Sequence, residues 1–292
     1  MMTSDALQFY ARHDSLTDPA GFARLYDELP AALPALCDVL SGLIVHTSWA
    51  AKYGIPPETP LPRDTKPVAE RLAEVARLFD GPLVTERPPL QRPFGTCRDF
   101  ALLLCSTLRH RGTPARVRCG FATYFAGRRY ADHWICEYWQ GDEGRWAMAD
   151  AQIDRLQRAS LGIGFDCAKL PNGAFLTAPA AWRLARSQAA DAEEFGHGDA
   201  GGLWFLHVNL HRDLLALANC QVSAWDMWRD ADEAGKSLSV ETLSACDRLA
   251  DLIIDSDTSV DWPELRPIAD GVRVPPWQRR SVERELARAP AN

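Results

Sequence analysis

Three residue types that together make a nucleophilic catalytic unit occur in order in the middle of this 292-residue chain. Cys97 stands in Gly-Thr-Cys-Arg-Asp-Phe-Ala, His133 in Asp-His-Trp-Ile-Cys-Glu-Tyr-Trp, and Asp150 ends Arg-Trp-Ala-Met-Ala-Asp. A cysteine thiol attacks an acyl carbon when a histidine accepts its proton, and a carboxylate can orient the histidine ring. If the fold brings these residues together, they can form and break an acyl thioester.

The sequence around Cys97 predicts the first turn of a helix. Thr96 is a common N-cap residue, and Asp99, three positions later, completes a capping-box pattern. Apolar residues repeat every four positions from Phe100 onward, and Gly112 ends the pattern. The unpaired N–H groups at a helix start stabilise negative charge. We therefore expect a lowered pKa for the Cys97 thiol.

Three strands are expected after this helix, the first of them half-buried because its apolar residues alternate. They cover residues 116–125, 130–139 and 145–149. A four-residue turn between the second and third strands pairs Gln140 with Arg145 and Ile135 with Asp150. His133 then lies diagonal to Asp150 on the same face of the sheet, within reach of its carboxylate.

The same count through the first hairpin pairs Arg118 with Glu137. It also brings Gly120 and Ala122 near His133. Small side chains at these two positions would leave room for a substrate beside the histidine. The register therefore predicts a carboxylate partner for His133 and room for a substrate beside it.

These segments resemble the core of the transglutaminase-like superfamily over about residues 90–155. The resemblance implies an α+β fold with a papain-like core, in which the nucleophile helix packs on an antiparallel sheet. It implies that Cys97 attacks an acyl carbon, that His133 takes and returns the proton, and that Asp150 orients the imidazole. The family includes crosslinking enzymes, proteases, peptide N-glycanases, acyltransferases and inactive members. A hydrolase or acyltransferase and an inactive binding or scaffold protein therefore both remain open.

Two positions of the predicted site have alternatives. The oxyanion formed during acyl transfer needs two donors, and the backbone N–H of Cys97 is one. Gln91 is spaced like the oxyanion glutamine of papain-like enzymes, but transglutaminases often use an upstream aromatic residue, and residues 81–96 contain no tryptophan. For the carboxylate, Asp132 and Asp154 compete with Asp150, although strand alternation points Asp132 to the opposite face.

Composition limits the partners. The formal net charge of −7 argues against nucleic acid and anionic membranes. No apolar run reaches the length of a membrane span, and the first residues lack the pattern of a secretory signal. Eight cysteines without a Cys-x-x-Cys pair fit reduced thiols in the cytoplasm. We expect a peptide, amide or acyl-thioester substrate, with water or an amine as acceptor, and no cofactor.

One further spacing is of the kind that binds metal ions. His207 and His211 stand four positions apart on a predicted helix, so both face the same side. No glutamate follows His207 directly, and the sequence offers no obvious third ligand. The sequence therefore predicts no metal site here.

The flanking sequence is predominantly helical in pattern. We expect an N-terminal helical extension over residues 1–82, a catalytic core over 83–160 and a C-terminal helical extension over 161–292, packed as one domain. Apolar spacing predicts helices at 19–29, 33–44, 66–79, 203–219, 240–254 and 282–287, with Ser239 capping the fifth. The proline-rich residues 82–93 are expected to form one wall of the active-site cleft.

Overall fold

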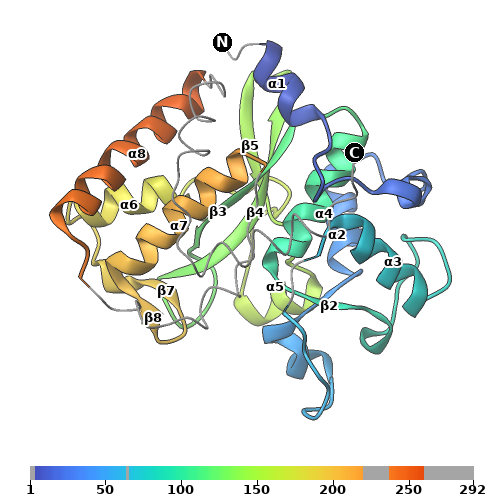
Figure 1. Ribbon diagram of the computed structural model, residues 1–292. Helices are drawn as coiled ribbons and strands as arrows, with labels where there is room; N and C mark the ends of the chain where they lie inside the picture. The colour runs from blue at the N-terminus through green and yellow to red at the C-terminus, as the bar shows by residue number, and fades with distance from the viewer. Residues whose placement is uncertain (1–3, 64–65, 220–236, 260–292) are drawn as a thin grey trace.

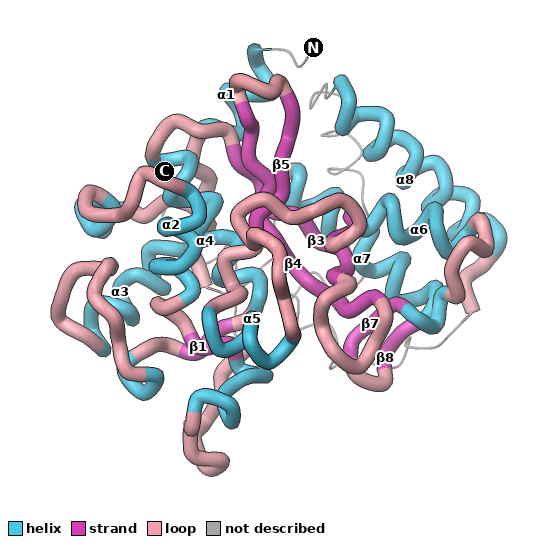
Figure 2. The backbone as a smooth tube through the Cα atoms, turned by 180° about the vertical axis from the view of Figure 1, so that it is seen from behind, coloured by secondary structure: helices cyan, strands magenta, loops and turns pink. Residues whose placement is uncertain are grey.

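A twisted sheet from the middle of the chain separates two groups of helices in the computed structural model, which describes residues 4–63, 66–219 and 237–259 (Figure 1). The first group contains α2 (Leu33–Ser41), α3 (Val68–Leu78) and α4 (Cys97–His110). The second contains α6 (Ala178–Arg186), α7 (Gly202–Leu217) and α8 (Val240–Ser259). The view from behind shows the same two groups on either side of β3 and β4 (Figure 2).

The sheet contains β3 (Ala115–Ala122), β4 (Tyr130–Gln140), β5 (Arg145–Ala149), β6 (Phe175–Thr177), β7 (Phe195–His197) and β8 (Ala200–Gly201). The strand order is β6-β3-β4-β7-β8, and β5 also pairs with β4. Neighbouring strands are antiparallel except β4 and β7, which are parallel. The predicted α+β class is confirmed, but the sheet is mixed and mostly antiparallel.

Helix α4 begins where the capping pattern predicts. The Asp99 carboxylate accepts the backbone N–H of Thr96 at 2.7 Å, which closes the capping box. Arg71 of α3 donates to the other oxygen of the same carboxylate at 2.6 Å. Both side chains are buried, so this ion pair fixes the start of α4 against α3. The position of Cys97 therefore depends on a cap and on a neighbouring helix.

Strand β3 is buried along its whole length, so the expectation of a half-buried strand is wrong. Helix α4 covers one side of β3 and β4, and α7 covers the other. The polar residues of the strand are paired instead of solvated. Arg116 and Arg118 donate to Glu137 at 2.7 Å, and Arg118 also forms two hydrogen bonds to Asp213 of α7.

The second hairpin has the predicted register and the first does not. Gln140 pairs with Arg145, as the four-residue turn requires. In the first hairpin Arg118 pairs with Ile135 instead of Glu137, because β3 ends at Ala122 and the connection is longer than expected. The shift is two residues, so each side chain keeps its predicted face.

Gly120 lies directly opposite His133 but leaves no space for a substrate. A Cβ atom at this position would lie 2.1 Å from the carbonyl oxygen of Leu176 and 2.7 Å from the ring of Phe175. The absence of a side chain therefore allows β6 to approach β3 closely. Ala122 is buried in an apolar cluster with Ile135 and Phe175. The prediction that small residues here make room for a substrate is wrong.

Most flanking helices lie near their predicted positions, including α2, α3, α7 and α8. Residues 20–26 form a 3₁₀ helix in place of the longer predicted α-helix. Ser239 accepts the backbone N–H of Thr242 at 3.2 Å, as its predicted cap requires. The sequence patterns missed α1 (Ser4–Ala11), α5 (Arg155–Leu161) and α6. The predicted helix at 282–287 lies outside the described residues, and the domain boundaries at 82 and 160 stay a prediction. Within the described residues no helix combines the length and apolar character needed to cross a bilayer.

Candidate active site

A cavity of about 610 Å³ contains both Cys97 and His133 in its lining. The other lining residues come from segments 46–52, 125–133, 152–161 and 196–199. The lining combines apolar side chains with basic and acidic ones, among them Arg128 and Asp199. The wall therefore offers contacts to both the apolar and the polar parts of a substrate.

Cys97 is the first residue of α4 and only 5% exposed. Burial raises the pKa of its thiol, and the Asp132 carboxylate raises it further. The backbone N–H groups of Trp134 and Arg98 hydrogen-bond to the sulfur and oppose this effect. Desolvation outweighs the favourable helix start, so the predicted lowering of the thiol pKa is wrong. The thiol is protonated in the free protein at neutral pH.

His133 lies on β4 with its ring nitrogen Nε2 2.8 Å from Asp150 Oδ2. Both side chains are 2% exposed. The same carboxylate accepts the Tyr124 hydroxyl at 2.6 Å and the backbone N–H of Gln152 at 2.9 Å. Burial alone would raise the pKa of Asp150, but the attraction of His133 and these hydrogen bonds lower it. Asp150 is therefore ionised and fixes the orientation of the ring.

The two alternative carboxylates have other partners. Asp132 also lines the cavity, but its carboxylate accepts the side-chain amide of Asn209 at 2.7 Å. Asp154 caps α5 and accepts the hydroxyl of Tyr53 at 2.6 Å. The structure thus joins His133 to Asp150, as the strand register predicts.

Gln91 does not lie in the cavity. It is exposed at the end of a short 3₁₀ helix, Pro89–Gln91, and is absent from the lining. No residue of the proline-rich segment 82–93 lines the cavity either, which corrects the prediction that this segment forms its wall. Several of its residues, Arg92 among them, line a different cavity with Asp38 and Asp154, before β2 (Phe94–Gly95) leads the chain into α4.

The wall beside Cys97 comes instead from residues far upstream. β1 (Val45–His46) pairs in parallel with β2, and His46 lies opposite Gly95. The pairing brings His46 and Trp49 to the cavity next to the start of α4. Sequence reasoning missed both residues, because two-residue strands carry no readable pattern.

His46 has a defined tautomer in this position. Its Nδ1 accepts the backbone N–H of Ser48 at 3.2 Å, so the ring proton lies on Nε2. Burial, and next to it the charge of His133, lower the pKa of His46 to about 3. At neutral pH the ring is therefore a neutral donor through Nε2.

Comparisons with known proteins match part of the chain. Residues 85–151 match the family model of the transglutaminase-like superfamily. No curated protein matches the sequence. Among solved structures, the chain is similar to a putative cysteine protease from Cytophaga hutchinsonii, with 18% sequence identity and a TM-score of 0.35. That match covers 55% of this chain and 45% of the other chain, less than half of its length.

The family match ends one residue after Asp150 and includes Cys97 and His133. It spans the helix and the three strands whose order and spacing carried the sequence resemblance. Residues 85–151 of this chain are a transglutaminase-like superfamily domain.

Proposed function

We propose that this protein is a cysteine enzyme that acts on an amide or a thioester through an acyl-Cys97 intermediate. One observation carries the proposal: Cys97 and His133 line the same cavity, and His133 is hydrogen-bonded to the buried carboxylate of Asp150 at 2.8 Å. A nucleophile, a base and a group that orients the base are the minimum for acyl transfer.

The proposed reaction follows from the hydrogen bonds of His133. Because Nε2 is held by Asp150, Nδ1 is the nitrogen left to accept the thiol proton. The raised pKa of Cys97 keeps the thiol protonated until a substrate binds. Proton transfer to His133 therefore accompanies formation of the bond between sulfur and the acyl carbon. His133 then gives this proton to the departing amine or thiol as the carbon–leaving-group bond breaks.

The second half of the reaction consumes the thioester. Attack by water, with its proton passing to His133, releases a carboxylic acid and hydrolyses the substrate. Attack by an amine forms a new amide and transfers the acyl group. The mixed polar and apolar lining suits a peptide or a similar amide. The described cysteines are all free, which fits action in a reducing cytoplasm.

We assign the second oxyanion donor to His46. Its Nε2 carries the proton, its ring is neutral at neutral pH, and it lies in the cavity beside the strand that leads into α4. Together with the backbone N–H of Cys97 it would donate to the oxygen that becomes negative in the tetrahedral intermediate. Gln91 is exposed and outside the cavity, so it does not suit this role.

Removing the His46 side chain should slow acylation of Cys97 by about 10²- to 10³-fold, the usual cost of losing one oxyanion donor. The measurement is the rate of acyl transfer from an activated ester in the His46→Ala variant. Alkylation by iodoacetamide forms no oxyanion, so its rate should stay within a few-fold of wild type. Equal losses in both reactions would mean that His46 only supports the position of Cys97.

Trp49 provides the matched comparison, because its indole N–H is another donor that lines the cavity from the same segment. Trp49→Phe removes that N–H and keeps a large aromatic ring. Its acylation rate should remain close to wild type. A loss in Trp49→Phe without one in His46→Ala would move the donor role to the indole.

The proposed function is tested by trapping the intermediate. Incubation with a panel of activated esters, thioesters and peptide amides should add one acyl mass to the intact protein, and peptide mapping should locate it on Cys97. The Cys97→Ala variant should gain none. Addition of an amine should release a new amide if the enzyme is an acyltransferase, whereas water alone releases the acid from a hydrolase.

The raised pKa of the Cys97 thiol also favours a second candidate function, that of a catalytically inactive protein with the same fold. Such a protein would use the cavity to bind a peptide or another partner. It would take up no more acyl group than Cys97→Ala with every member of the panel, although it remains folded. That result would overturn the proposed enzyme and favour a binding or scaffold role.

A further inference from the structure

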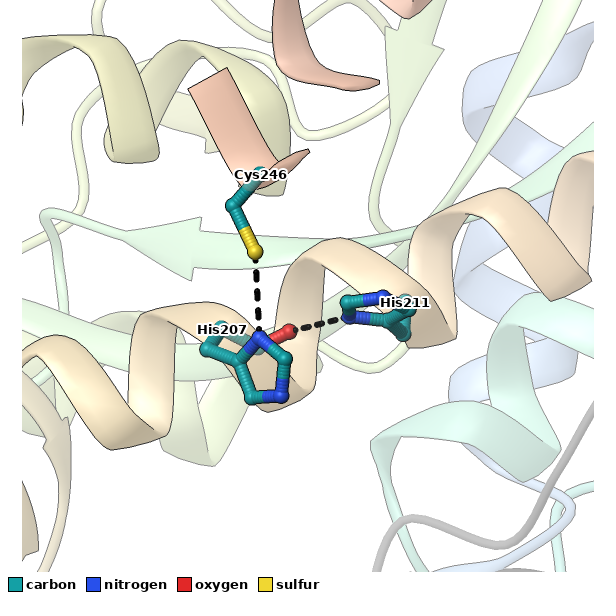
Figure 3. Close-up of side chains that lie close together, drawn as sticks. All are labelled: His207, His211 and Cys246. Carbon is teal, nitrogen blue, oxygen red and sulfur yellow. Dashed lines mark hydrogen bonds between the residues drawn. The ribbon is translucent and has the colours of Figure 1, made fainter. Parts of the chain in front are cut away.

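Two histidines and a cysteine converge between α7 and α8, away from the cavity that contains Cys97 (Figure 3). His207 and His211 lie one turn apart on α7, and Cys246 approaches them from α8. One ligand atom from each residue lies within 4.8 Å of the others. His207 Nδ1 and Cys246 Sγ are 3.1 Å apart.

The hydrogen bonds orient these side chains as a metal site requires. His211 Nδ1 donates to the backbone carbonyl of His207 at 2.8 Å, which leaves the lone pair of Nε2 free. Histidine ligands of metals usually donate their second ring nitrogen to a carbonyl or carboxylate in this way, because it fixes the tautomer and the ring orientation.

The chemistry of the three groups suits a metal ion. Neutral imidazoles and a thiolate are the forms that bind metal ions, so the Cys246 thiol must lose its proton when an ion enters.

We propose that His207, His211 and Cys246 form a Zn²⁺ site that links α7 to α8. A tetrahedral Zn²⁺ ion with Zn–N bonds near 2.0 Å and Zn–S bonds near 2.3 Å separates its nitrogen and sulfur ligands by about 3.5 Å. The observed distance of 3.1 Å between His207 Nδ1 and Cys246 Sγ is shorter, and a small side-chain rotation would bring the two atoms to the separation that Zn²⁺ requires. Two imidazoles and one thiolate are ligands that Zn²⁺ prefers over Mg²⁺ or Ca²⁺.

The site leaves one coordination position for water. Cys246 is 2% exposed, whereas both histidine rings are partly exposed and give an ion a path from solvent. The sequence predicted no metal site because the third ligand is not near the histidine pair in the chain. Helix packing supplies it, with α6 holding α8 next to α7.

The test uses the untagged full-length chain with Cys97→Ser, so that the catalytic thiol cannot bind the probe. Co²⁺ added to the metal-stripped protein should give a thiolate-to-cobalt charge-transfer band and the visible bands of a tetrahedral site, saturating at one ion per chain. Zn²⁺ should displace Co²⁺ and raise the melting temperature. His207→Gln should weaken Co²⁺ binding by more than about 100-fold, since it removes a direct ligand.

Two variants, each with one cysteine replaced by serine, distinguish metal binding at this site from metal binding by any cysteine of the protein. Cys246→Ser should lose the charge-transfer band and the Zn²⁺-dependent rise in melting temperature. Cys37 is a buried cysteine on α2 that lines neither site. The Cys37→Ser variant should therefore keep both the charge-transfer band and the Zn²⁺-dependent rise in melting temperature. The proposal is overturned if the folded Cys97→Ser protein shows no such band, or if the band survives Cys246→Ser. Neither outcome bears on acyl transfer at Cys97.

Discussion

His133→Ala is expected to slow acyl transfer to Cys97 by about 10²- to 10⁴-fold at neutral pH, the range that a positioned general base contributes. Without the histidine, the reaction depends on the small fraction of Cys97 that is already thiolate. Burial raises the pKa of this thiol, so that fraction grows as the pH rises through the alkaline range. The residual rate of His133→Ala should therefore increase about tenfold per pH unit above pH 8. Stopped-flow measurement with an activated ester would give both results.

Asparagine variants of Asp150 and Asp132 test which of these two carboxylates orients His133. Asp150→Asn removes the charge that orients the ring and should slow acylation strongly. Asp132→Asn removes a charge that raises the pKa of Cys97 and that is bound to Asn209 instead. It should leave acylation intact and should speed alkylation of Cys97 by iodoacetamide. The reverse pattern would make Asp132 the partner of His133.

Asp213→Asn is expected to lower the free energy of unfolding by about 3–5 kcal/mol, the cost of removing one partner from a buried ion pair. Arg118 and Asp213 have fully buried side chains and form two hydrogen bonds, at 2.9 and 2.8 Å. Arg116 and Glu137 extend this ion pair into a buried cluster. The amide would leave the buried guanidinium of Arg118 without the negative charge of one of its two carboxylate partners. Urea unfolding measures the loss.

An exposed ion pair between α6 and α8 provides the comparison for Asp213→Asn. Asp251 lies 3.3 Å from Arg183 of α6, and both side chains are more than half exposed. Asp251→Asn should change the free energy of unfolding by less than about 1 kcal/mol, because solvent screens the pair. If Asp213→Asn were equally mild, the buried cluster would not contribute to stability beyond filling space.

Local patterns were sufficient to predict the central part of the fold. The cap at Thr96 and Asp99, the apolar spacing of α4 and the alternation of the strands depend on neighbouring residues, so the sequence displays them directly. The contact between His133 and Asp150 follows from the same patterns. It depends only on the register between β4 and β5, which the four-residue turn predicts correctly, so the two-residue error in the first hairpin does not affect it.

The features that could not be predicted depend on segments far apart in the chain. His46 reaches the cavity through a pairing of two-residue strands, and Cys246 reaches His207 through the packing of α8. The pKa of Cys97 follows from burial, which depends on everything packed around α4. The position of Cys97 at a helix start predicted a lowered pKa, because neighbours in the sequence do not show how strongly a side chain is desolvated.

The cavity around Cys97 is assembled from segments between residues 46 and 199. A ribosome adds about 5–20 residues per second, so about 5–20 s separate the synthesis of Cys97 from that of Asp199. During this interval the emerging chain contains Cys97 but lacks a complete cavity around it. Contacts between such distant segments also form slowly. The topology therefore completes the cavity around Cys97 only after Asp199 has been synthesised, so no ligand that needs all of its walls can bind before then.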